Sequence, residues 1–444
     1  MAERRGRHSA GRKPRRKRPI PTSPQGRRSA GPRKSALSRR RKTFRKRSFA
    51  GGGAVTLAVS AVLVIVAVIA GTNAVADRGG DDSGDERGRQ TAGTPSDQTT
   101  YLVVGTETSS SGPEVSWMTL IGIDPAAARA SIAYLPAHTA YEVPGQGLQG
   151  IGEALGTGGI SLISVSVENM LGVGIDHFIE LPNSDAEDLF EQTGDLTVNV
   201  PQEVRVSAGV DTSQVLFDAG EQVLPPRFQT DLLYEVGLDD DETELGSRHL
   251  AFWQSFVETH SADPQALESA LASASGALDS SDSSPAEQAS FFSDLVSLSP
   301  EEVTISALPV EEEVTGETEL YSISDADIRS FVGETFGEAP NTGDEVRVQI
   351  LNGNGQPGMA QAVAERLVGK GYRVVLSGNA NELDYEDTRI VIYESTPDAQ
   401  AAGERARELL GTGNLQVSVQ QQGIVDLTIV VGKDFIDAVG TEDD

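Results

Sequence analysis

A long stretch without charge, close to the N-terminus, constrains this chain more than any other feature. The 29 residues between Arg47 and Asp77 contain no Asp, Glu, Lys or Arg, and their centre, AVTLAVSAVLVIVAVIAG (54–71), is almost wholly aliphatic. About 20 apolar residues cross a bilayer as a helix, so we predict a transmembrane helix at residues 50–72. A cleaved signal peptide is the alternative, because IAGTNAVADR has small residues of the A-x-A kind, but the preceding basic region is far longer than in a usual signal.

Charge is divided sharply between the two sides of this stretch. Residues 1–48 hold 20 of the 36 Lys and Arg and a single acid, whereas the other 396 residues carry 16 basic and 65 acidic side chains. Because the basic side of a membrane helix faces the cytoplasm, we predict a disordered cytoplasmic tail at 1–48 and an acidic bulk outside the cell. The tail is expected to contact anionic lipid headgroups and not nucleic acid. The absence of cysteine excludes thiolate metal sites and Cys nucleophiles.

The extracellular part is predicted to contain two domains of the α/β class. Residues 73–99 and 336–345 are polar linkers, and between them residues 100–335 alternate apolar strand patterns with amphipathic helix patterns. The strands expected are TYLVVG, WMTLIGID, ASIAYLP, HFIELP, LTVNVP and EVTISALPV, with helices near 161–171, 184–192, 246–260, 264–275 and 285–298. This order predicts a layered α/β/α domain, although the pattern is blurred after residue 211.

A smaller α/β domain is predicted at residues 346–436. Its expected strands are 346–351, 372–377, 389–393, 415–419 and 426–431, and its expected helices are 358–368 and 397–410. In the first of these helices, Met359, Val363 and Leu367 recur every four residues and form one buried stripe.

Three glycines at the start of this domain, Gly353, Gly355 and Gly358, have the G-x-G-x-x-G spacing of a dinucleotide-binding turn. The second strand, however, ends in VVLSG, where a nucleotide site needs an Asp or Glu. The domain is also too small for two mononucleotide-binding halves and is expected outside the cell. We therefore interpret the glycines as a tight strand-to-helix turn with Asn-Gly pairs that suit positive φ.

The C-terminal domain resembles the LytR C-terminal domain over residues 345–436. The segments that carry the resemblance are VRVQILNGNGQPGMAQAVAERLVGKGYRVV, IVIYESTP and LTIVVGKDF. In actinobacteria this domain usually follows a LytR-CpsA-Psr catalytic domain or a bare membrane anchor.

The preceding domain resembles a degenerate LytR-CpsA-Psr domain. The segments TYLVVGTET, WMTLIGIDPAAARASIAYLPAHTAYEVPGQG and SVENMLGVGIDHFIELPNSDAEDLFEQTGDLTVNVP follow that layout in order. The resemblance implies transfer of glycopolymers from a polyprenyl-pyrophosphate carrier to peptidoglycan, with acids that hold Mg²⁺ and arginines that clamp the pyrophosphate. Phosphoryl transfer depends on such positioning and charge neutralisation.

Most of the charged residues that this chemistry implies are replaced. Glu107 keeps a carboxylate, and Arg248 lies one position away from an expected arginine. The other matching positions hold Ser109, Ser116, Ala137, Ser247 and Leu250.

Five side chains remain as candidates or need an interpretation. His138 is a candidate base or metal ligand, although a polar loop residue is the simpler interpretation. Arg227 and Arg248 are candidate anion ligands, against pairing with surface acids. We expect His177 to be structural, His249 to lie on a helix surface, and the acidic run GLDDDETE (237–244) to be a solvated loop.

Two functions follow from these patterns. The first is a non-catalytic envelope protein on a membrane anchor, which binds a lipid-linked glycopolymer, peptidoglycan or a partner protein and needs no cofactor. The second is a phosphotransferase with a rearranged site of Glu107, His138 and Arg248, in which Glu107 holds Mg²⁺. The phosphotransferase is favoured if Arg227 and Arg248 point into the same cleft as Glu107. The non-catalytic protein is favoured if they lie outside it.

Overall fold

The computed structural model describes residues 98–440, apart from short gaps at 111, 210–211, 239, 279, 316–317, 338–344 and 419–423. All of these residues fall in one compact unit, Gln90–Asp444. Within the described range, no helix has the length and apolar character needed to cross a bilayer. The span predicted at 50–72 lies outside the described residues, as do the tail at 1–48 and nearly all of the linker at 73–99.

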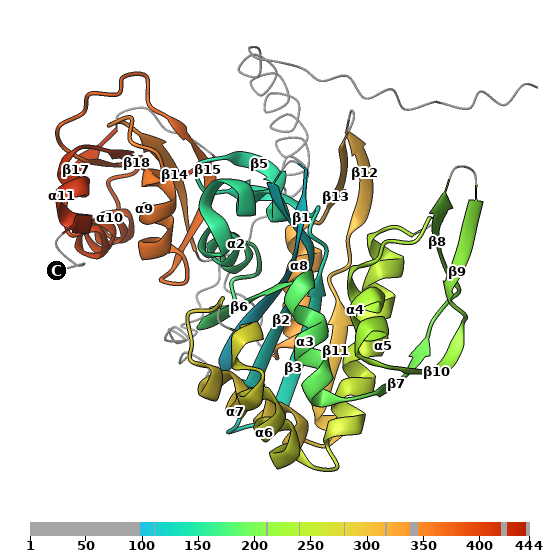
Figure 1. Cartoon of the computed structure of the whole chain (residues 1–444). Helices are drawn as coiled ribbons and strands as arrows, with labels where there is room; N and C mark the ends of the chain where they lie inside the picture. The colour runs from blue at the N-terminus through green and yellow to red at the C-terminus, as the bar shows by residue number, and fades with distance from the viewer. Residues whose placement is uncertain are drawn as a thin grey trace, which may run out of the picture. The chain divides into compact units, whose positions relative to one another are not determined.

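The first domain is built on a five-stranded mixed sheet in the order β11-β3-β2-β1-β6 (Figure 1). The central strands β1 and β2 are antiparallel, while β6 pairs with β1 and β11 pairs with β3 in parallel. The strands are β1 (Thr99–Ser109), β2 (Gly112–Asp124), β3 (Arg129–Leu135), β6 (His177–Pro182) and β11 (Val303–Ala307).

Helices cover both faces of this sheet, which confirms the predicted α/β layering (Figure 1). Side chains alternate along β1, so that Leu102 and Val104 pack into one core while Tyr101 and Val103 pack into the other. The first core contains α2 (Leu155–Leu171) and α8 (Asp325–Thr335). The second contains α3 (Asn183–Thr193), α4 (Pro226–Tyr234), α5 (Glu242–His260), α6 (Pro264–Ser273) and α7 (Pro285–Ser297).

Four two-stranded antiparallel sheets extend from this framework. They are β4 (Ala140–Val143) with β5 (Gly147–Gly150), β7 (Leu196–Val200) with β10 (Gly220–Leu224), β8 (Val204–Gly209) with β9 (Thr212–Phe217), and β12 (Glu311–Thr315) with β13 (Thr318–Ser322). The segment after residue 211, whose pattern is blurred in the sequence, begins with the short strands β9 and β10 and continues into α4.

The second domain has its own five-stranded sheet in the order β15-β14-β18-β16-β17 (Figure 1). The predicted order of its elements is confirmed, with one extra helix at the end. The elements are β14 (Val346–Asn352), α9 (Met359–Leu367), β15 (Tyr372–Asn379), β16 (Arg389–Ile392), α10 (Pro397–Leu410), β17 (Asn414–Val417), β18 (Leu427–Val431) and α11 (Asp434–Gly440).

The glycine-rich turn between β14 and α9 satisfies its own backbone groups. Gly355 and Gly358 have φ angles of 78° and 81°, which other residues rarely adopt. Asn352 Oδ1 accepts hydrogen bonds from the backbone N–H groups of Asn354 (3.2 Å) and Gly355 (2.9 Å), and Asn354 Oδ1 accepts one from Gln356. The glycines therefore serve a tight turn closed by asparagine side chains. That the turn binds no dinucleotide remains a prediction.

Candidate functional site

The site implied by the family resemblance lies beyond a bulge near the end of β1. The bulge falls between Gly105 and Thr106, and Glu107 follows it with an exposed side chain. The Glu107 carboxylate accepts hydrogen bonds from Asn183 Nδ2 (2.7 Å), at the start of α3, and from Ser116 Oγ (3.0 Å), on β2. Both partners are neutral, so these contacts hold the carboxylate in place without adding positive charge.

Other acids lie around Glu107. Glu180, near the end of the parallel strand β6, accepts a hydrogen bond from Thr106 Oγ1 (3.0 Å). Burial raises the pKa of Tyr234 well above its usual value, and the negative charges of Glu107, Asp185 and Glu180 raise it further. The surroundings of Glu107 are therefore acidic, which is unfavourable for a pyrophosphate group.

Arg248, the candidate closest to a clamp arginine, is fully buried in α5. Its Nη2 donates to Asp240 Oδ2 at 2.6 Å, and its Nη1 donates to the backbone carbonyl of Glu235 at 2.9 Å. The Asp240 side chain is itself only 5% exposed. This is a buried ion pair with a further hydrogen bond, and breaking such a pair is strongly unfavourable.

Arg227, by contrast, is 74% exposed at the start of α4. Its closest acid is Asp231, one helical turn later, with 4.0 Å between Nε and Oδ2. An exposed pair of this kind contributes little to stability. The guanidinium is accessible to an anion, but no contact given for the described residues links it to Glu107.

His138 has an acidic partner that is remote in sequence. Its Nδ1 lies 2.5 Å from Oε1 of Glu242, the first residue of α5, and Tyr134 donates its hydroxyl hydrogen to Oε2 of the same carboxylate (2.9 Å). The predicted solvated loop at 237–244 is therefore wrong in its second half, because Asp241 caps α5 and Glu242–Glu244 form its first turn. The three candidates Glu107, His138 and Arg248 thus have different hydrogen-bond partners, although the charges of both Glu107 and Arg248 act on the Glu235 carboxyl.

Two other histidines are structural. The expectation that His249 lies on a helix surface is wrong: the side chain is fully buried between Trp117 and Tyr134, at ring-centroid distances of 5.1 and 4.9 Å. Burial lowers the pKa of His249 to about 3, so the ring is neutral. The sequence indicates a single apolar face for α5. The helix is buried on more than one face, and His249 lies on a face that the apolar pattern does not mark.

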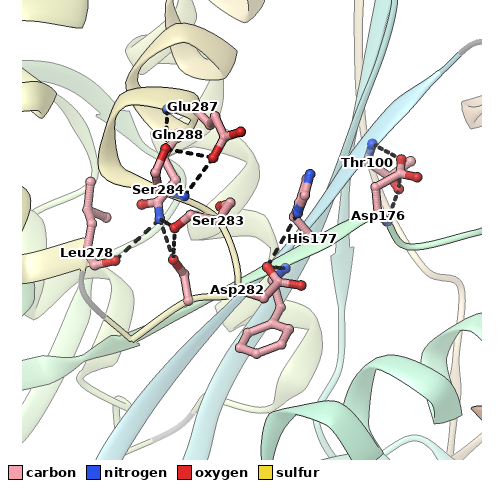
Figure 2. Close-up of polar contacts among 11 residues, drawn as sticks. Thr100, Asp176, His177, Leu278, Asp282, Ser283, Ser284, Glu287 and Gln288 are labelled. Atoms are coloured by element: carbon pink, nitrogen blue, oxygen red, sulfur yellow. Dashed lines mark hydrogen bonds and ion pairs between the residues drawn. The ribbon is translucent and has the colours of Figure 1, made fainter. Parts of the chain in front are cut away.

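His177 lies at the opposite end of the sheet from Glu107, where β6 begins. Figure 2 shows its ring facing Asp282, and its Nδ1 lies 3.5 Å from Asp282 Oδ1. The Asp176 carboxylate accepts hydrogen bonds from the backbone N–H and the hydroxyl of Thr100. The same view shows the Gln288 amide holding the loop before α7 through Leu278 and Ser283. These contacts tie the beginnings of β1 and β6 to α7, which agrees with a structural role for His177.

An apolar cavity lies inside the second core, beneath the Glu107 end of the sheet. It is lined by β1, β2, β6 and the covering helices, through Val103, Trp117, Leu181, Phe190, Trp253 and Leu271 among others, and it has no polar lining surface. Its free volume of about 50 Å³ is smaller than one isoprene unit, so a hydrocarbon chain would need the helices to move apart. No pattern in the sequence predicts this cavity, because its lining residues come from six or more elements. Both tryptophans of the chain, Trp117 and Trp253, line it.

The charge of the first domain also limits what it binds. Residues 98–335 contain 41 Asp and Glu against five Arg and no Lys. Such a surface repels polyanions at long range. Among the residues described, no group of three His, Asp or Glu side chains is placed to hold one metal ion.

Comparison with protein families identifies the C-terminal domain. Residues 345–435 match the family described as LytR cell envelope-related transcriptional attenuator. The chain therefore ends in a LytR C-terminal domain, which confirms the resemblance derived from its sequence, and the family's description relates it to the cell envelope. The comparison with curated proteins gave no match.

Solved structures similar to the chain cover a little over half of it. TagV of B. subtilis is 15% identical with a TM-score of 0.47, covering 56% of this chain and 99% of that structure. The protein gbs0355 from Streptococcus agalactiae is 14% identical with a TM-score of 0.44 (54% and 87%), and TagT bound to LIIa-WTA is 15% identical with a TM-score of 0.42 (56% and 94%). At these TM-scores the similarities carry no argument about function, and none of these matches bears on an actinobacterial origin.

Proposed function

We propose that this chain is a membrane-anchored cell-envelope protein that binds a lipid-linked ligand without transferring its headgroup. The observation that carries the proposal is the burial of Arg248. The arginine nearest in sequence to the family's clamp position is used by Asp240 and Glu235 within the fold. It cannot reach a ligand without breaking a buried ion pair.

Phosphoryl transfer needs positive charge where the leaving oxygens develop negative charge. The Glu107 carboxylate has neutral partners and acidic neighbours instead. Removing a single electrostatic donor from an active site costs about 10²–10³ in rate. With serine, alanine and leucine at the other matching positions, several donors are missing together, which supports a binding role.

The apolar cavity supports a ligand that is recognised through hydrocarbon. Its lining presents no polar surface, so a polyprenyl chain could occupy it once the covering helices move apart. The strongly acidic surface opposes recognition through a polyanionic headgroup. We therefore infer that the lipid part of a carrier, not its glycopolymer, contributes most of the affinity.

The alternative, a rearranged phosphotransferase, requires Glu107, His138 and Arg248 to act on one substrate. Each of these side chains has its own partner: Asn183 and Ser116 for Glu107, Glu242 for His138, and Asp240 for Arg248. These separate hydrogen bonds favour binding over the alternative, although the charges of Glu107 and Arg248 both act on Glu235.

Tryptophan fluorescence tests lipid binding directly, because the only two tryptophans of the chain line the cavity. Titrating the full chain in detergent with undecaprenyl phosphate should shift the emission in a saturable way. Leu271→Phe, which fills the cavity, should weaken binding about tenfold or more, equivalent to at least about 1.4 kcal/mol. Leu238→Phe is the matched control, because Leu238 is 56% exposed and does not line the cavity.

A turnover assay separates the two functions. With Mg²⁺ and a polyprenyl-pyrophosphate glycolipid, the full chain should release no phosphate above the blank. Turnover that is lost in Glu107→Gln would establish the phosphotransferase and overturn our proposal. An unchanged tryptophan emission at saturating lipid would refute the lipid-binding part, whatever the turnover assay shows.

A further inference from the structure

The edge strand β15 of the C-terminal domain is held by a side chain of the first domain. Asn169, near the end of α2, is 3% exposed. Its Nδ2 donates to the backbone carbonyl of Val374 (3.0 Å), and its Oδ1 accepts from the backbone N–H of the same residue (2.8 Å). One amide side chain thus satisfies both backbone groups of an edge-strand residue, as a neighbouring strand would.

A second contact in this interface buries a carboxylate. Glu142, on β4, accepts a hydrogen bond from Ser377 Oγ on β15 (2.5 Å), and the backbone N–H of Gly145 donates to the same hydroxyl oxygen (2.8 Å). Burial raises the pKa of Glu142 to about 7, although the hydrogen bonds from Ser377 oppose this shift. No charged group contributes to that shift, so the ionised carboxylate has no cation to compensate its burial.

A third contact partly buries the Glu168 carboxylate of α2. A side chain at Gly369, in the turn before β15, would approach Glu168 Oε1 to 2.4 Å, so the two segments are tightly packed. Burial raises the pKa of Glu168 to about 7, the negative charge of Asp176 raises it further, and Lys370 lowers it. A single lysine therefore compensates this carboxylate only in part.

The remaining charged groups of the interface centre on Arg373. Its Nη1 lies 3.2 Å from Asp325 Oδ1 and 3.4 Å from the hydroxyl of Tyr141. Burial raises the pKa of Tyr141 to about 12, and Arg373 stays charged at all physiological pH. Glu345 lies beside Arg373, and burial raises its pKa despite that positive charge.

We propose that the contact of α2 and β4 with β15 is a proton-controlled latch, which holds the C-terminal domain against the first domain in acid and releases it as the pH rises through neutrality. Asn169 supplies the specific contact, and Glu142 and Glu168 supply the pH dependence. The latch is independent of the proposed lipid binding.

The direction of the effect follows from linkage. A carboxyl whose pKa is higher in the docked state than in the free state favours docking while it is protonated. Docking is therefore complete below the ordinary value of about 4.5 and is lost as the pH rises through about 7. Between pH 5 and pH 8 each carboxylate should weaken docking about tenfold or more.

Energy transfer between two labels tests the latch in the full chain. The chain has no cysteine, so one cysteine can be introduced at Leu238 in the first domain and another at Leu383 in the second, both half exposed or more. We expect transfer between pH-insensitive dyes to fall between pH 5 and pH 8.5 with a midpoint near 7. In Glu142→Gln/Glu168→Gln, whose two substituted side chains cannot ionise, transfer should lose most of its change with pH, and Glu345 accounts for any change that remains.

Matched variants keep the outcome clear. Asn169→Ala should show the undocked value at every pH, and Ser377→Ala tests the same interface from the other side if Asn169→Ala does not fold. Glu187→Gln, which neutralises an exposed carboxylate on α3, should titrate as the unmodified chain does. A wild-type transfer that does not change with pH, or a double glutamine variant that titrates like the wild type, would overturn the proposal.

Discussion

At the scale of single residues, the partners of a side chain decide its role more than its type does. Arg248 and Arg227 are both arginines on helices of the first domain, yet one is fully buried on Asp240 and the other is 74% exposed beside Asp231. Both arginines are candidate anion ligands by sequence. The sequence does not indicate which of them is buried, because nothing in it distinguishes Asp240 from Asp231 as a partner. The ion pair of Arg248 is therefore a property of the fold.

Replacing Arg248 should destabilise the first domain strongly. Arg248→Met leaves the Asp240 carboxylate buried without its cation, and we expect a loss of about 3–5 kcal/mol in the free energy of unfolding. Asp240→Asn added to it should restore part of the loss, because the two sites are coupled. Urea unfolding followed by tryptophan emission measures this, since both tryptophans lie in the first domain.

Arg227→Met provides the comparison, with an expected change of less than about 1 kcal/mol for an exposed pair. A stable Arg248→Met variant that had lost ligand binding would instead make Arg248 a ligand residue and would contradict its structural role.

At the scale of elements, segments with a strong apolar periodicity were predicted correctly from the sequence, whereas local irregularities such as bulges and kinks were not. The two domains, the order of strands and helices in the second, and α6 and α7 in the first agree with the sequence. TYLVVG was expected to stop at Gly105, but β1 continues to Ser109 past a bulge, which no sequence period encodes. The expected helix at 161–171 is present, but α2 also includes a short helical turn from Leu155 that is separated from it by a kink at Gly159, with φ of 69°.

The glycine turn before α9 can be tested through its backbone alone. Gly358 has φ of 81°, and a Cβ placed there would meet no atom within 4 Å. Gly358→Ala should therefore destabilise the C-terminal domain by about 1–2 kcal/mol, which is the cost of the left-handed conformation.

Gly333, in α8, provides the opposite test. A Cβ placed there also meets no atom within 4 Å, but the backbone of this residue is helical. Gly333→Ala should stabilise its domain by about 0.5–1 kcal/mol, because alanine loses less backbone entropy in a helix. Thermal unfolding of both variants provides the measurement, and a neutral Gly358→Ala would contradict the turn as described.

At the scale of the whole molecule, the division of charge can be predicted from the sequence, whereas contacts between residues far apart in the chain cannot. The site residues were only partly predictable, because Glu242 lies 104 residues from His138 and Val374 lies 205 residues from Asn169. The cavity was not predictable at all, since its lining is collected from many elements. The charge division was visible at once: 20 of the 36 basic residues fall within the first 48, and residues 98–335 have no lysine.

This division leads to a prediction for the full chain in its membrane. A helix at 50–72 with 20 basic residues before it should leave the N-terminus in the cytoplasm, because positively charged flanks are retained on that side. The acidic remainder, with 65 Asp and Glu, should then lie outside, where both the lipid site and the latch would meet the envelope. Protease added to intact spheroplasts should remove a C-terminal tag and leave an N-terminal tag intact, whereas lysis should expose both. A C-terminal tag that survives in intact spheroplasts would reverse the topology, and the lipid site and the latch would then face the cytoplasm.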